Sequence, residues 1–170
     1  MKITDKSIFQ LDAEIVAVFL LGKMICRLLP SGEVIKKRIT IVEIYKQDDS
    51  ACHAYKGKTK RNAPLFDAGG TLYVYLCYGL FYLLNIVTGK PNNAQGILIC
   101  GVDEVVGSGR VSKVLQMDNT LNNQTIFTSN HLWLEEDGFI IGSIKREKRI
   151  GISYAKEQDQ NKLWRLSIQL

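Results

Sequence analysis

The sequence contains little of what would place it outside the class of ordinary globular domains. Only 3 prolines and 14 glycines occur among its 170 residues, which excludes collagen-like and low-complexity chains. No apolar run is long enough to cross a membrane, since residues 15–21 are too few and residues 72–87 include four tyrosines. The first ten residues have no apolar stretch of the kind found in secretory leaders. We therefore expect a protein that stays inside the cell and away from membranes.

Metal-binding and disulfide-forming residues are also scarce. The chain has 4 cysteines, none of them in a CxxC pair, and only 2 histidines, His53 and His131. Their spacings match no standard zinc site, so no metal is expected. We interpret the isolated cysteines as reduced, mostly buried thiols of a cytosolic protein; they are Cys26, Cys52, Cys77 and Cys100.

What the chain does contain is enough apolar material for one core. Hydrophobic residues make up 46% of the sequence and charged residues 23%, values that fit a single folded domain of this length. We therefore expect one domain over residues 1–170. Lys and Arg number 22 against 17 Asp and Glu, which gives a net charge of +5. This charge is compatible with a polyanionic partner, but many unrelated proteins share it.

Local patterns predict an α+β domain with a curved, mostly antiparallel sheet. Asp12 precedes a helical apolar pattern that Gly22 ends. Extended runs on both sides of residues 30–32 predict a hairpin, and Ser108 is a candidate cap for a short helix ending at Leu115. Consecutive strands without regular helical crossovers favour antiparallel pairing with short flanking helices. Residues 46–70 have the composition of a surface loop, and the further segments with a strand pattern are 71–79, 96–104, 131–136, 149–153 and 163–168.

Glu43 interrupts an otherwise apolar strand pattern. Side chains alternate along a strand, so the face that carries Glu43 also carries Ile39, Ile41 and Tyr45. A carboxylate that is desolvated among such side chains is suited to take a proton from water. The alternative is an exposed edge-strand glutamate paired with a lysine, and this segment alone favours that alternative.

Tyrosines are concentrated in the strand pattern that follows. Tyr73 and Tyr75 project from one face, and Tyr78 lies at a turn beside Gly79. Such residues are common in a sheet core. Tyrosines at the mouth of a pocket are also suited to stack on a planar base. The residues alone slightly favour the core.

Two segments are candidates for binding an anion. The loop of residues 48–62 is either solvated or in contact with a phosphate backbone. Residues 107–110, with the sequence GSGR, precede a predicted helix and offer backbone amides to an anion, although this is a weak phosphate signal. The loop surrounds His53 with four cations, Lys56, Lys58, Lys60 and Arg61.

Taken together, these segments resemble the alkyladenine (3-methyladenine) DNA glycosylase family, the base-excision enzymes that remove alkylated or deaminated purines. The resemblance follows the family order from FLLGKMICRLL to RIGISYAKE and covers most of the chain. Its most specific element is the pattern GTLYVYxxYGxxxxxN of residues 70–85, preceded by an ExY element at residues 43–45 and a loop histidine. The resemblance implies a monofunctional enzyme that flips and hydrolytically excises 3-methyladenine and 7-methylguanine from duplex DNA, with hypoxanthine and ethenoadenine as further candidate substrates.

The resemblance assigns the chemistry and the base pocket to matching positions. It implies that Glu43 activates the hydrolytic water. Tyr45 and Tyr75 would stack on the two faces of the extruded base, and His53 would pack against the same base and hydrogen-bond to it. A base that is buried in a duplex has to be extruded before its sugar can be attacked, so a stacking slot of this kind fits the reaction.

The same resemblance extends to the pocket rim and to the DNA. Tyr73 would support the pocket, Tyr78 would enter the duplex in place of the flipped nucleotide, and Asn85 would reject purines with a 2-amino group. The family has an arginine near the hydrolytic water where this chain has Cys100. Because a thiol supplies no cation, we expect weaker positioning of the water, or its positioning by a residue such as Arg110, and reduced activity on neutral lesions such as hypoxanthine. Candidate phosphate contacts are Lys58, Lys60, Arg61 and Arg110.

The resemblance further implies no cofactor, a monomer, and double-stranded DNA with a damaged purine as the partner. Its location would be with the DNA, in the cytoplasm or nucleoid, or in the nucleus of a eukaryote. Two other functions stay open at this point. One is a non-catalytic binder of DNA damage whose chemistry is impaired by Cys100, and the other is a basic nucleic-acid-binding domain without a repair role.

Overall fold

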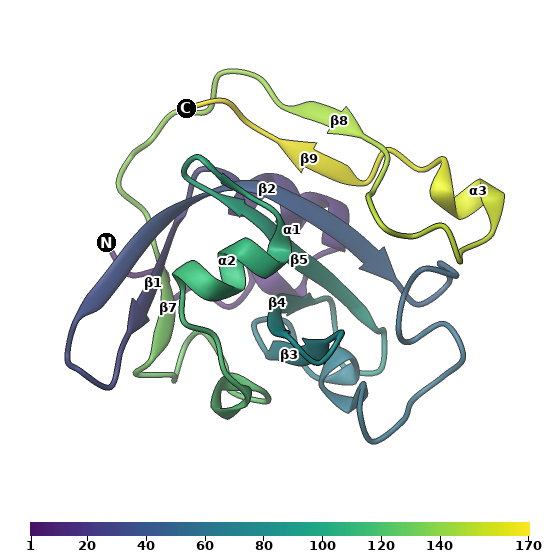
Figure 1. Cartoon of the computed structure of the whole chain (residues 1–170), viewed down its shortest axis with the longest axis horizontal. Helices are drawn as coiled ribbons and strands as arrows, with labels where there is room; N and C mark the ends of the chain where they lie inside the picture. The colour runs from purple at the N-terminus through teal and green to yellow at the C-terminus, as the bar shows by residue number, and fades with distance from the viewer.

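The computed structural model describes residues 1–170, which form one curved antiparallel sheet with three short α-helices (Figure 1). The main strand order is β3-β4-β5-β2-β1-β7, while β6 pairs with β5, β9 with β2 and β8 with β9. This arrangement confirms the predicted α+β class. The strands are β1 Met24–Leu28, β2 Val34–Lys46, β3 Leu72–Cys77, β4 Phe81–Thr88, β5 Gln95–Val102, β6 Val105–Val106, β7 Leu132–Glu135, β8 Lys145–Glu147 and β9 Arg165–Ser167.

Two of the three helices cover the sheet. The side chain of Asp12 caps α1 by accepting a hydrogen bond from the backbone N–H of Glu14, as the sequence predicted. In the view of Figure 1, α1 lies behind β2 and β5, and α2 lies in front of β4 and β5. The predicted cap of α2 was wrong by one residue, because Gly107 with φ +113° is the cap and Ser108 is the first helical residue. The helices are α1 Ala13–Leu20, α2 Ser108–Val114 and α3 Glu157–Gln160, and the 3-10 helices are η1 Ile8–Gln10, η2 Ala63–Phe66 and η3 Asn119–Leu121.

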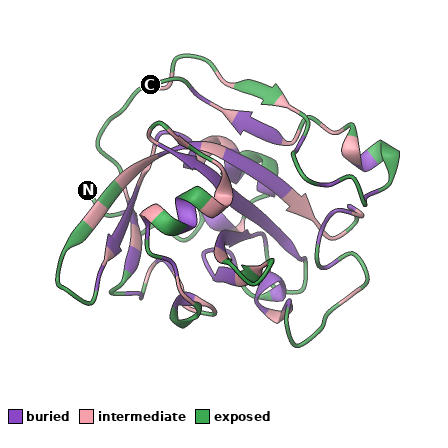
Figure 2. Cartoon of the chain, in the orientation of Figure 1, coloured by how far each residue is buried: buried purple, intermediate pink, exposed green.

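Strand β2 is the long central strand of the sheet. Its first half pairs with β1 in the predicted hairpin, whose turn is completed by Gly32 with φ +88°. Its second half pairs with β5 on one side and with β9 on the other. Figure 2 shows the resulting change along the strand, from exposed at its start to buried where β5 and β9 flank it. The residues of β2 that carry functional interest therefore lie in the most enclosed part of the sheet.

The two faces of β2 differ from the predicted alternation at one point. Val42 and Ile44 belong to the main apolar core, as expected for the face opposite Glu43. Ile39 also belongs to that core, although strict alternation placed it with Glu43. The pairing of β2 with β5 shifts register on both sides of Ile41. An irregularity of this kind turns the side chains on one side of it to the other face, which is why the prediction for Ile39 was wrong.

Strands β3 and β4 form a hairpin with a tight turn at Tyr78 and Gly79. Both residues have positive φ, +51° and +67°, and the N–H of Leu80 bonds to the carbonyl of Cys77. This is the geometry of a type I′ turn, which matches the twist of a hairpin and favours glycine at its second central position. Tyr78 is 92% exposed at the tip. The sequence predicted the turn, while β4 was not predicted as a separate strand.

Other segments depart from the sequence-based expectations. Residues 149–153 form no strand. The C-terminal strand that pairs with β2 is β9, which lies further along the chain. The segment read as a surface loop folds inward in part: Asp49 and Asn62 are buried, and Asn62 donates to the carbonyls of His53 and Gly57. Strand β8 and helix α3 were not predicted.

The C-terminal segment crosses the far end of β2. Figure 1 shows β8, β9 and α3 together above the sheet, with β9 next to β2. This placement brings residues 149–165 against the second half of β2 and the segment that follows it. No helix of the structure is long and apolar enough to span a membrane.

Candidate functional site

Glu43 lies buried in β2 at the floor of a cleft. Its side chain is 2% exposed, and three donors hold the carboxylate. The Nη1 of Arg165 lies 2.9 Å from Oε1, the backbone N–H of Ile150 lies 3.0 Å from the same oxygen, and the Tyr45 hydroxyl lies 2.8 Å from Oε2. A buried charge is tolerated where it is paired and hydrogen-bonded in this way. The alternative of a solvated edge-strand glutamate was therefore wrong.

A pocket opens beside Glu43 between aromatic side chains. Tyr45 lines it together with His53, Tyr73 and Tyr75, and the last three rings contact one another. The ring centroids of His53 and Tyr75 are 4.5 Å apart, and those of Tyr73 and Tyr75 are 5.2 Å apart. The pocket is open to solvent. Several aromatic rings around one opening favour a flat ligand.

Burial keeps the side chains of the pocket wall uncharged. The Nδ1 of His53 lies 2.9 Å from the Tyr73 hydroxyl. Desolvation and the nearby charge of Arg61 lower the pKa of His53, so its ring is neutral at pH 7. Burial raises the pKa of Tyr73 to about 12 and also raises that of Tyr75, so both hydroxyls stay protonated. The pocket wall is therefore uncharged.

Asn85 enters the pocket from β4. It pairs with Tyr73 of β3 on one side and with Leu98 of β5 on the other, so the sheet register places it at the pocket base. Its amide nitrogen donates to the carbonyl of Tyr73 at 3.2 Å. The amide group is thereby held in one orientation at the inner end of the slot.

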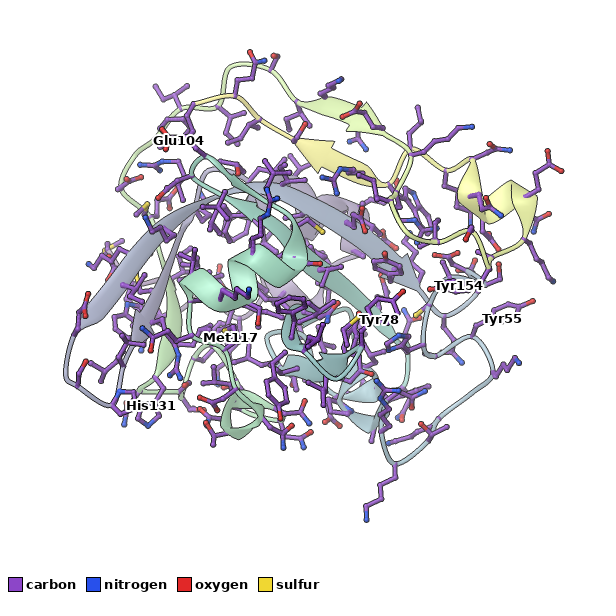
Figure 3. The ribbon with its side chains drawn as sticks, viewed as in Figure 1. Tyr55, Tyr78, Glu104, Met117, His131 and Tyr154 are labelled. Carbon is purple, nitrogen blue, oxygen red and sulfur yellow. The ribbon has the colours of Figure 1, made fainter.

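A wider cleft continues from the pocket to the surface. Glu43 and Arg165 line it together with Tyr78 and Tyr154. Figure 3 labels Tyr78 on the β3–β4 hairpin and Tyr154 in the C-terminal segment, on the same side of the molecule. Leu76 and Leu80 add exposed apolar surface to the hairpin. The hairpin tip thus presents an aromatic ring beside the opening above Glu43.

The predicted phosphate-contact residues occupy two different places. Arg61 donates to the carbonyl of Leu76 at 3.1 Å and lies over the Tyr75 ring, at the edge of the cleft. Lys58 lies over the Phe66 ring, while Lys60 is exposed nearby. Arg110 is exposed on α2 and does not line the cleft, although Gly107 and Ser108 before it do. The site therefore combines one loop of cations with the start of α2.

Sequence reasoning missed two residues that the C-terminal segment supplies. Arg165 contacts Glu43, and Tyr154 lines both the pocket and the cleft while its hydroxyl donates to the carbonyl of Ala51. The only local signal for Arg165 was an arginine within the apolar run LWRLSI. Nothing in that run indicates a carboxylate partner 122 residues away.

Cys100 lies on the same side of the sheet as Glu43. It is 3% exposed and packs with Leu83 and Leu98 under the cleft. Burial and the charge of Glu43 raise the pKa of its thiol, so the sulfur is uncharged. The cation beside Glu43 therefore comes from Arg165, and not from position 100 or from Arg110.

No group of three or more His, Cys, Asp or Glu side chains is arranged to hold a metal ion. The sequence model of the methylpurine-DNA glycosylase family matches residues 7–107 and 102–170. The chain belongs to this family. The match spans the ExY element, the tyrosine hairpin and the C-terminal strand, which together form the cleft described above.

Relatives carry names that agree with this assignment. A protein of Borrelia garinii subsp. bavariensis, assigned as a 3-methyladenine DNA glycosylase, is 38% identical, with 96% of this chain and 95% of the relative covered. The DNA-3-methyladenine glycosylase of Arabidopsis thaliana is 34% identical over 99% of this chain and 72% of its own length. A Legionella pneumophila protein assigned to the same activity is 32% identical, with 92% and 90% covered. These names describe hydrolases that act on N-glycosyl bonds, and they place this methylpurine-DNA glycosylase family member among enzymes of DNA repair.

Proposed function

We propose that this protein is a monofunctional DNA glycosylase that flips a damaged purine out of duplex DNA and hydrolyses its N-glycosyl bond. The observation that carries the proposal is the buried carboxylate of Glu43 at the floor of a cleft, beside an aromatic slot. A carboxylate there meets the sugar of a nucleotide whose base occupies the slot. The substrates are 3-methyladenine and 7-methylguanine, with hypoxanthine and ethenoadenine as further candidates.

The reaction needs one water and one base. Glu43 takes a proton from the water as the water oxygen forms a bond to C1′ of the flipped nucleotide. The bond from C1′ to the purine nitrogen breaks, and the purine leaves with the electron pair. A base that alkylation has made cationic leaves as a neutral purine and needs no acid. The products are the free base and an abasic site in an intact strand.

Strand cleavage by the same protein is not part of the proposal. A glycosylase that also cuts the strand uses an amine nucleophile, which forms a Schiff base with the sugar. Neither the pocket nor the cleft is lined by a lysine. This supports a single hydrolytic step.

The slot supports selection of flat, electron-poor bases. Tyr45 would cover one face of the purine, and Tyr75 with His53 would cover the other. A cationic base gains from the negative faces of the rings, and the neutral wall adds no repulsion. Asn85, held at the inner end by Tyr73, would meet the purine edge and reject a 2-amino group.

The hairpin tip supports base flipping. Extrusion costs a few kcal/mol of stacking, and the exposed ring of Tyr78 would fill the space that the nucleotide leaves. The cations Lys60 and Arg61 lie near the cleft edge, and Lys58 of the same loop lies over the Phe66 ring; phosphate contacts of this loop would hold the duplex. Arg110, on α2, would contact the backbone further along. The protein would act as a monomer, since one chain supplies every group named here.

The test is release of free bases from methylated duplex DNA. Purified protein is incubated with methylated genomic DNA, and the supernatant is separated by chromatography. We expect 3-methyladenine and 7-methylguanine to be released without strand breaks, and Glu33→Gln, in the exposed β1–β2 turn, to behave as the unaltered protein. Tight binding to lesion DNA with no released base would instead support the non-catalytic binder. Equal binding to damaged and intact duplex would support the third alternative, a basic nucleic-acid-binding domain.

A further inference from the structure

The arginine next to Glu43 comes from the last strand of the chain. In the sheet register, Glu43 of β2 pairs with Leu98 of β5 on one side and with Arg165 of β9 on the other. Cross-strand partners in antiparallel pairs bring side chains on one face into contact. The Arg165 side chain is 10% exposed and lines the cleft, and its Nη1 lies 2.9 Å from Oε1 of Glu43. It is thus part of the cleft floor.

The two carboxylate oxygens of Glu43 accept different numbers of hydrogen bonds. Oε1 accepts from Arg165 and from the N–H of Ile150, and Oε2 accepts only from the hydroxyl of Tyr45. A carboxylate oxygen has about two lone-pair sites. Oε1 is therefore fully occupied, while Oε2 keeps one site free. A proton taken from water would go to Oε2.

The small side chain of Cys100 leaves room for the Arg165 guanidinium beside Glu43. It follows Leu98 by two residues on β5, so its side chain lies on the same face as Glu43, and it is buried there. Its thiol is small and uncharged. An arginine at position 100 would bring a second guanidinium to the carboxylate that Arg165 already binds. The two positions are alternatives for placing one cation beside the same acid.

The other buried arginines do not have this role. Arg27 pairs with Asp118, and Arg149 pairs with Asp49. Arg165 is the one arginine with a side-chain hydrogen bond to Glu43. Its remaining guanidinium nitrogens make no hydrogen bond to a protein oxygen, so Glu43 is its only carboxylate partner, and the Cys100 thiol lies next to it.

We propose that Arg165 is the positioning residue of the reaction: it occupies Oε1 of Glu43 from β9, takes the place of a cation at position 100, and leaves Oε2 as the oxygen that deprotonates water. This inference rests on the proposed function and assigns its acid–base geometry. A cation therefore lies beside Glu43 although position 100 is a cysteine. The reason for expecting reduced activity on neutral lesions no longer applies.

The test compares single-turnover base release with lesion binding in position-165 variants. Arg165→Gln should lower the release rate roughly 10- to 100-fold, the effect of losing one charge-assisted hydrogen bond. The dissociation constant for lesion DNA should change less than about threefold, since the aromatic slot is intact. Arg146→Gln on the neighbouring strand β8, which is exposed and has no carboxylate partner, is the matched control and should keep the original rate.

A second-site variant separates positioning from support of the fold. Cys100→Arg alone should lower the rate, because it forces two guanidinium groups on one carboxylate. Cys100→Arg combined with Arg165→Gln should release base at least about tenfold faster than Arg165→Gln, since the cation is restored from the other strand. A purely structural role for Arg165 in β9 would lower the melting temperature and would not be rescued from β5.

The outcomes decide the proposal. Loss of rate with retained binding, and rescue by the double variant, support it. An unchanged rate in Arg165→Gln, or a folded double variant without rescue, overturns it. If the double variant does not fold, Arg165→Lys decides: a rate within about fivefold of the original supports the proposal, and a rate as low as that of Arg165→Gln overturns it. Failure of the unaltered protein to release any base would refute the proposed function itself.

Discussion

Two buried ion pairs join the segment around β2 to the C-terminal part of the chain, and they differ in what remains free. Asp49 and Arg149 are completely buried, and the Arg149 guanidinium also donates to the carbonyls of Ile44 and Asp159. Glu43 and Arg165 instead line the cleft, and one lone-pair site of Glu43 remains open. The first pair is enclosed by protein, whereas the second faces the space where a substrate would lie.

The Asp49–Arg149 pair therefore supports the fold, and the Glu43–Arg165 pair takes part in the proposed reaction. Arg149 lies between the rings of Tyr45 and Trp164, 4.7 and 5.1 Å from their centroids, and thereby supports the back of the pocket wall. Breaking an enclosed pair leaves an uncompensated charge and destabilises the fold. Altering the pair at the cleft floor changes the chemistry first.

Glu43→Gln should have the largest effect on activity. The amide keeps the shape of the side chain but takes no proton from water, so single-turnover base release should fall by roughly 10²- to 10⁴-fold. Binding to lesion DNA, measured by fluorescence anisotropy, should stay within a few-fold of the original. Release at an undiminished rate would show that Glu43 is not the base.

Arg149→Met should have the largest effect on stability. It leaves the Asp49 carboxylate buried without its partner, so the free energy of unfolding should fall by about 3–5 kcal/mol, measured by denaturant titration. Base release by the folded variant should change far less than in Glu43→Gln. Adding Asp49→Asn should recover part of the loss by removing the unpaired charge. A stable Arg149→Met variant without activity would contradict the distinction between the two pairs.

Tyr78→Ala should affect the extrusion of the base and not the fold. The ring is 92% exposed, so the melting temperature should change little, and the alanine relieves none of the positive φ at this turn position. Loss of one stacking ring should lower excision from duplex DNA about tenfold. Excision from single-stranded DNA should fall less, because no vacated position in a duplex has to be filled. Equal losses on both substrates would argue against an intercalating role.

The pH dependence of lesion binding should be the smallest effect. The pKa of His53 is lowered from 6.5, so the ring is neutral at pH 7 and gains its charge only as the pH falls below that value. The charged ring would repel a cationic purine, so binding of 7-methylguanine should weaken toward low pH while binding of hypoxanthine should not. His53→Asn should remove this difference. Parallel pH profiles for both lesions would place His53 away from the base.

Much of the scaffold could be predicted from local patterns. The cap at Asp12, the hairpin around Gly32 and the turn at Gly79 each depend on a few neighbouring residues, and the structure confirms them. The errors arose where distant pairing decides local structure. Ile39 changed face because of a register irregularity against β5, and residues 149–153 stay irregular because β9 and not they pair with β2.

The site residues that were predicted and the one that was missed differ in the same way. Glu43, Tyr45, Tyr73 and Tyr75 were predicted from motifs, because each motif lies within one strand. Arg165 was not, because its partner is 122 residues away and a single arginine in an apolar run has no periodic signature.

The amino-acid sequence by itself determined the hairpin around Gly32, the tight turn that exposes Tyr78, and the family to which the chain belongs. Those features follow from alternation, from glycine at positive φ and from motif spacing, all of which act over a few residues. Only the tertiary structure decided which cation meets Glu43 and which of its oxygens stays free. That choice depends on β9 pairing with β2 across most of the chain, and a contact between strands so far apart in sequence exists only once the sheet has assembled.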